Sequence, residues 1–89
     1  MTQSLQALIE QLNHPDVNVR SRAVLDIGAL DDVDALDTLL DALVTETDLM
    51  VREDITWALV RIGGRAVPPL IDLLSDPDPA VRHQATHVL

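Results

Sequence analysis

The sequence at residues 36–43 reads LDTLLDAL, with leucine at positions 36, 39, 40 and 43. This spacing (i, i+3, i+4, i+7) puts four apolar side chains on one face of a helix. The same spacing occurs 31 residues earlier, at 5–12, and 31 residues later, at 67–74. The matching residues are Leu5, Leu8, Ile9 and Leu12 in the first copy, and Val67, Leu70, Ile71 and Leu74 in the last. One amphipathic helix therefore recurs three times at a fixed period, which indicates a repeat protein.

A second pattern, Asp-x-x-Val-Arg, follows each of these helices after a short polar link, at residues 16–20, 48–52 and 78–82. The aspartate can accept the unpaired amides in the first turn of a second helix, so it is predicted to be an N-cap. Pro15 and Pro77 precede it and prevent the first helix from continuing. Turn signals follow the second helices, Asp31-Asp32 and Gly63-Gly64. The predicted helices are 3–12, 17–30, 33–44, 49–62, 66–74 and 79–89.

Apolar positions also align between the second helices, for example Ile27, Leu59 and Leu89. One helix pair cannot bury both of its apolar faces, so the pairs must stack on one another. We therefore predict one all-α domain over residues 1–89, with repeats at about 1–32, 33–64 and 65–89. No glycine, basic turn or polar capping repeat follows the last helix. This end is predicted to be open: part of a longer array, covered by self-association, or frayed.

Composition excludes several classes of function. The formal net charge of -9 and the pI near 4.3 argue against nucleic acid, whose binding relies on clustered Lys and Arg. Zero cysteines exclude a disulfide scaffold and a thiol nucleophile. No apolar run approaches the length of a membrane span, and the first residues lack the layout of a signal peptide. We expect a cytoplasmic protein whose core consists of Leu, Val, Ile and Ala, since Phe and Tyr are absent.

The segments LNHPDVNVRSRAVLDIGAL, VTETDLMVREDITWALVRIGG and LSDPDPAVRHQATHVL resemble the HEAT-repeat family, in particular its short-repeat branch called phycobilisome-lyase HEAT-like. The resemblance covers nearly the whole chain. It implies a right-handed α-solenoid, or superhelix, of three HEAT-like hairpins with six helices. It also implies a structural ladder of hydrogen bonds between the capping aspartates and the helix arginines of successive repeats. That ladder would comprise Asp16, Arg20, Asp48, Arg52, Asp78 and Arg82.

A candidate binding face lies on the second helices. With Val51 facing inward, a rotation of about 100° per residue puts Glu53, Trp57 and Val60 on the opposite side. The equivalent positions in the other repeats include Leu25, His83 and His87. The resemblance implies that second helices line the concave surface, so these residues are predicted to bind another protein. Trp is enriched among residues that dominate binding energy. The alternative is that Trp57 folds over the seam between two repeats and covers core.

Other candidate sites are weaker. His83 and His87 have the i, i+4 spacing that can hold a metal, but HQATH lacks further ligands and a catalytic Glu, so neither a metal nor another cofactor is predicted. Glu10, Asp41 and Asp72 form an acidic strip on the first helices, which is either solvated or able to bind a basic partner.

No nucleophile elbow, phosphate-binding loop or pair of acids in a pocket can be drawn from the sequence, so no catalytic residue is predicted. We expect a non-catalytic scaffold or adaptor that binds protein. The alternatives are a regulatory or lyase-like subunit of an enzyme complex, and a structural repeat unit that assembles with itself.

Overall fold

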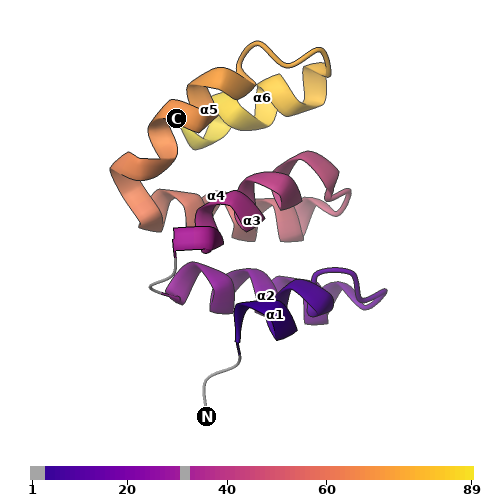
Figure 1. The fold of residues 1–89 in the computed structure, drawn as a ribbon. Coiled ribbons are helices and arrows are strands. Elements are labelled where there is room, and N and C mark those ends of the chain that lie inside the picture. The colour runs from indigo at the N-terminus through magenta and orange to yellow at the C-terminus, as the bar shows by residue number, and fades with distance from the viewer. Residues whose placement is uncertain (1–3, 31–32) are drawn as a thin grey trace.

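The computed structural model describes residues 4–30 and 33–89, and every regular element in these ranges is a helix. Three helical hairpins stack in chain order, from α1 and α2 at the bottom of Figure 1 to α5 and α6 at the top. The elements are α1 (Leu5–Gln11), α2 (Val17–Ala29), α3 (Val33–Thr45), α4 (Leu49–Ile62), the 3-10 helix η1 (Gly63–Ala66), α5 (Val67–Leu73) and α6 (Pro79–Val88). The predicted all-α solenoid is confirmed, and the ends of each α-helix lie within two residues of the predicted ones.

The capping aspartates begin the second helices as predicted. The carboxylate of Asp16 accepts the amide of Asn18, and that of Asp78 accepts the amide of Ala80. Asp48 accepts two amides, from Met50 and Val51. It therefore provides a hydrogen-bond acceptor for more of the unpaired first-turn amides than the other two caps do.

The turn after α4 is made by glycine. Gly63 has φ of 79°, a conformation that L side chains rarely adopt, and it ends the helix. The chain then continues through η1 into α5, where Pro68 lies in the first turn and needs no amide partner. The other predicted turn, Asp31-Asp32, lies outside the described residues.

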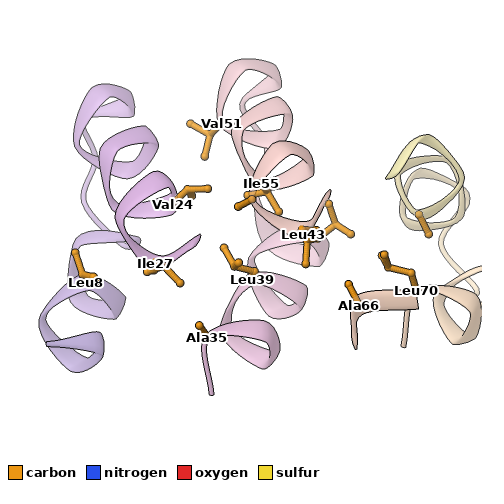
Figure 2. Packing of buried hydrophobic residues seen from close by; sticks show 13 residues of the cluster. Leu8, Val24, Ile27, Ala35, Leu39, Leu43, Val51, Ile55, Ala66 and Leu70 are labelled. Carbon is orange, nitrogen blue, oxygen red and sulfur yellow. The ribbon is translucent and has the colours of Figure 1, made fainter. Parts of the chain in front are cut away.

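The core is a continuous cluster of Leu, Val, Ile and Ala side chains, as the composition predicts. Figure 2 shows Val24 and Ile27 of α2 pointing toward the middle hairpin, where Leu39 and Ile55 lie, while Leu70 belongs to the third hairpin. The cluster consists of Leu8, Val24, Ile27, Ala35, Leu39, Leu43, Val51, Ile55, Ala58, Leu59, Ala66, Leu70 and Ala85. One core therefore runs through all three hairpins.

The second helices form the closely packed side of the stack. α2 packs along α4 and α4 packs against α6, whereas α1, α3 and α5 pack mainly on second helices. Gly28 allows the close approach of α2 and α4, because a Cβ atom built there would lie 2.9 Å from the Cβ atom of Ala58. The stack measures 38 × 26 × 16 Å, and none of its helices over residues 4–30 and 33–89 is long and apolar enough to cross a bilayer.

The prediction of Leu89 as a core residue is wrong. Its counterparts Ile27 and Leu59 are 0% and 1% exposed, because the next hairpin packs over each of them. Leu89 follows the end of α6 and is 52% exposed, because no hairpin within residues 4–30 and 33–89 packs over it.

Candidate functional site

The candidate binding face contains the most exposed large apolar side chains of the second helices outside their first turns. Trp57 in α4 is 66% exposed, and Val60, one turn further along, is about half exposed. Leu25 has the equivalent position to Trp57 in α2 and is also half exposed. Since α2 packs along α4, the three side chains lie on neighbouring helices. We call the surface formed by Leu25, Met50, Glu53, Trp57, Val60 and His87 the second-helix face.

Met50 is the member of this face that the sequence prediction missed. It is half exposed and lies seven residues before Trp57, which places the two within about 20° around the helix axis. The helical rotation used for the other residues also finds Met50. Met50 lies in the first turn of α4, between the N-cap Asp48 and the inward Val51.

Glu53 and His87 come together across the seam between the second and third hairpins. The Nε2 atom of His87 lies 2.9 Å from the Oε1 atom of Glu53, in hydrogen-bond contact. Both side chains are about half exposed, so the pair adds little stability, and it forms a polar edge to the second-helix face. His83 is exposed and has no hydrogen bond within the described ranges.

Polar side chains join the hairpins at both seams next to α4. Beneath the exposed face, the Nε2 atom of Gln84 in α6 donates to the hydroxyl of Thr56 at 3.0 Å, and both side chains are buried. The Thr56 hydroxyl in turn donates to the carbonyl oxygen of Arg52. At the other seam, the Ser21 hydroxyl donates to the carboxylate of Asp54. Trp57 takes no part in these contacts, and most of it remains in solvent.

The predicted ladder between capping aspartates and helix arginines is wrong for the described residues. Each arginine turns back to carbonyl oxygens of the loop that precedes its own helix. Nη1 of Arg20 donates to the carbonyl oxygens of His14 and Pro15. Nη1 of Arg82 donates to those of Asp76 and Pro77. Nε of Arg52 donates to the carbonyl oxygen of Glu46 at 2.7 Å. The aspartates accept amides of their own helices through Oδ1 instead.

One arginine does link two repeats, through a glutamate. Arg20 in α2 makes a two-pronged contact with the Glu46 carboxylate, Nε to Oε2 at 3.1 Å and Nη2 to Oε1 at 3.2 Å. The two side chains are 16% and 9% exposed. Partly buried, bidentate pairs are stronger than surface ion pairs, so this contact helps to fix the first hairpin on the second.

The first helices carry a separate feature. A shallow hollow of about 210 Å³ lies between α1 and α3, and no side chain of a second helix lines it. Its lining residues are Ile9, Leu12, Asn13, Thr38, Asp41, Ala42, Thr45 and Glu46. Of the acidic strip predicted on the first helices, Asp41 lies at this hollow, while Glu10 and Asp72 are exposed on α1 and α5. Within the described ranges, no group of three or more His, Cys, Asp or Glu residues could hold a metal ion.

Comparison with known proteins gives two findings. The family model described as HEAT repeats matches residues 5–89. A curated relative, the "Uncharacterized phycocyanin operon protein Z" of Pseudanabaena tenuis, is 32% identical over 87 residues, which is 97% of this chain and 43% of the relative. The chain thus spans less than half the length of that relative. A family match over nearly all of the sequence, together with the three stacked hairpins, shows that the chain belongs to the HEAT-repeat family.

Proposed function

We propose that the protein is a non-catalytic interaction module that binds another protein on its second-helix face. The observation that carries the proposal is the exposure of Trp57, with Leu25, Met50 and Val60 exposed on the same side. Proteins built from such repeats use their extended surfaces to bind other proteins. A large apolar side chain held in solvent on a rigid helix suits this role, because little conformational entropy is lost when it is covered.

The packing of the helices supports a concave second-helix face. Direct contact between α2, α4 and α6 draws the second helices together, whereas the first helices make most of their contacts with second helices. A stack that is tight on one side bends toward that side. A partner bound there would contact more than one repeat at once.

The charge limits the choice of partner. The net charge of -9 makes the chain unsuited to nucleic acid or to anionic lipid, which favours a protein as the partner. The proposed place of action is the cytoplasm.

The test is capture of a partner from a lysate of the native cells by immobilised protein. We compare the wild type with Trp57→Ala and with a control, Val44→Ala, which removes an exposed apolar side chain from α3. Trp57→Ala should lose the partner while its melting temperature stays within about 2 °C of the wild type, because little of the indole is buried. Val44→Ala should retain the partner.

Two results would count against the proposal. Equal capture by all three proteins would show that the partner binds elsewhere. A melting temperature lowered by several degrees in Trp57→Ala, with capture unchanged, would assign the indole to packing instead.

The name of the curated relative favours a second candidate, a subunit that acts in phycocyanin biogenesis. This candidate predicts binding to a phycocyanin subunit or to its bilin. Mixing the purified protein with bilin, and with apo-phycocyanin plus bilin, and recording the visible absorbance separates the two cases. An unchanged spectrum, with no complex on gel filtration, would remove this candidate.

A further inference from the structure

A shallow hollow separates the first helices of the first two hairpins. Both α1 and α3 pack on α2 but make little contact with each other, so the space between them stays open. The hollow has a volume of about 210 Å³, and its apolar wall consists of Ile9 and Leu12 at the end of α1 and Ala42 of α3. This wall can hold the hydrocarbon part of a side chain.

The two hydroxyl groups at the hollow already donate their hydrogens within α3. The Thr38 hydroxyl donates to the carbonyl oxygen of Asp34 at 3.0 Å, and the Thr45 hydroxyl donates to that of Asp41 at 3.1 Å. A hydroxyl has one hydrogen to donate and two lone pairs to accept with. Both oxygens are therefore available to a ligand as acceptors only.

Two carboxylates complete the polar side of the hollow. That of Glu46 is occupied, because it accepts the guanidinium of Arg20 and the amides of Thr47 and Asp48. Asp41 is exposed, and its carboxylate has no hydrogen-bond or ionic partner within residues 4–30 and 33–89. No basic side chain is among the described residues that line the hollow, so this negative charge is not balanced there.

The first helices carry acids and no bases. The charged residues of α1, α3 and α5 are Glu10, Asp34, Asp37, Asp41 and Asp72. The six arginines of the chain lie elsewhere, five in the second helices and Arg65 in η1. The negative charge of the first helices therefore attracts a cationic ligand toward the hollow.

We propose that the hollow between α1 and α3 binds one arginine side chain from a basic segment of a partner protein. The stem of the arginine packs on the apolar wall, as long cationic side chains commonly do on apolar surface. Its guanidinium has five donors and no acceptor, which suits the Asp41 carboxylate and the hydroxyl oxygens of Thr38 and Thr45. The site is separate from the second-helix face and does not depend on it.

A protein segment suits the hollow better than a free small molecule does. Sites for small ligands usually enclose roughly 300–1,000 Å³ and bury most of the ligand. This hollow is smaller and shallow, so it can hold one side chain of a larger partner. Neighbouring basic residues of the same segment would face the exposed acids Glu10 and Asp37.

The test is a titration of ¹⁵N-labelled protein with the peptide acetyl-Ala-Arg-Ala-Ala-Arg-Ala-amide, followed by nuclear magnetic resonance. A matched peptide carries citrulline, which has the shape of arginine without its charge, at both arginine positions. The arginine peptide should cause saturable shifts at the amides of Asn13, Thr38, Ala42 and Thr45, which line the hollow. The citrulline peptide should cause little change.

Two variants with the same change in net charge locate the contact. Asp41→Asn removes the carboxylate at the hollow, whereas Asp72→Asn removes an exposed carboxylate from α5. Asp41→Asn should weaken binding of the arginine peptide about tenfold, as expected for a lost hydrogen bond to a charged group. Asp72→Asn should weaken it less than about twofold, since only the general attraction is reduced. Circular dichroism checks that both variants fold.

Equal weakening by Asp41→Asn and Asp72→Asn would overturn the proposal, because it would show diffuse attraction to the acidic helices. Equal shifts with the arginine and citrulline peptides, no saturable shift, or shifts centred on α4 or α6 would overturn it too. Ethylguanidine tests the other source of the same cation. If it binds at the same amides as tightly as the peptide does, the ligand is a free small cation and not a protein segment.

Discussion

Gly28 and Ala58 set how closely α2 and α4 approach. A Cβ atom on residue 28 would lie 2.9 Å from the Cβ atom and 3.3 Å from the Cα atom of Ala58. Neither neighbour is the end of a flexible side chain, so the two helices would have to separate. The closest seam of the stack thus depends on the absence of one methyl group.

Gly28→Ala should therefore destabilise the protein. Alanine favours the helix by about 1 kcal/mol, but overpacking a tight seam costs about 1–3 kcal/mol, so the net loss should be about 1 kcal/mol. In a domain of this size that lowers the melting temperature by roughly 4–8 °C, measurable by circular dichroism. Gly64→Ala is the control, because a Cβ atom there has no neighbour within 4 Å. A Gly28→Ala protein as stable as Gly64→Ala would show that the helices separate at no cost.

Single residues were predictable from the sequence where their role is local. The capping of the second helices depends on a residue and the amides two or three positions later, so Asp16, Asp48 and Asp78 were assigned correctly. The partner of Arg20 is 26 residues away, in a loop whose path depends on how the hairpins stack. The sequence shows which side chains can pair, but not which of several acids comes within reach.

α4 is the central helix of the stack, because it contacts α2, α3 and α6 and carries Met50, Trp57 and Val60. Its N-terminus is fixed by Asp48, whose Oδ1 accepts the amides of Met50 and Val51 at 2.9 and 3.1 Å. Fraying of this turn would release Met50 from the second-helix face.

Asp48→Ala should cost about 1 kcal/mol of unfolding free energy, within the usual range of about 0.5–2 kcal/mol for a lost N-cap. Asp48→Ser should retain most of the stability, since its hydroxyl can accept the same amides. Urea unfolding monitored by circular dichroism measures both. Equal losses for the two variants would mean that Asp48 acts through its charge or through packing rather than as a cap.

The helices themselves were predictable because apolar residues recur at helical spacing and each second helix has a capping residue. The 3-10 helix η1 could not be predicted from the sequence. Two adjacent glycines signal a turn, but the backbone geometry of that turn, with φ of 79° at Gly63, depends on where α5 must begin to pack on the stack.

At the scale of the whole molecule, stability should be uneven along the stack. Within residues 4–30 and 33–89, the middle hairpin has neighbours on both sides, while the third packs on the middle one alone, with less contact with α4 than α2 makes. The period of the sequence predicted that the hairpins stack, but not this inequality. It arises from pairs such as Gly28 and Ala58, whose fit depends on three-dimensional contact.

Native-state hydrogen exchange should reveal the gradient. In repeat proteins each unit is stabilised by its neighbours, so amides in α6 should exchange faster than those in α4. Peptide-resolved mass spectrometry at several urea concentrations tests this. Protection of α6 equal to that of α4 would mean that the protein opens as one cooperative unit.

Trp57 is proposed to be a surface residue that a protein partner covers. Trp57 is the one tryptophan, and the chain has no tyrosine, so intrinsic fluorescence reports this side chain alone. In the isolated protein the indole is 66% exposed, and its emission should resemble that of tryptophan in water and be quenched readily by acrylamide. On addition of the captured partner, or of a tryptophan-free version of it, the emission should shift to shorter wavelength and quenching should fall. Short-wavelength emission that is shielded from acrylamide before any partner is added, and unchanged afterwards, would show that Trp57 is a packing residue.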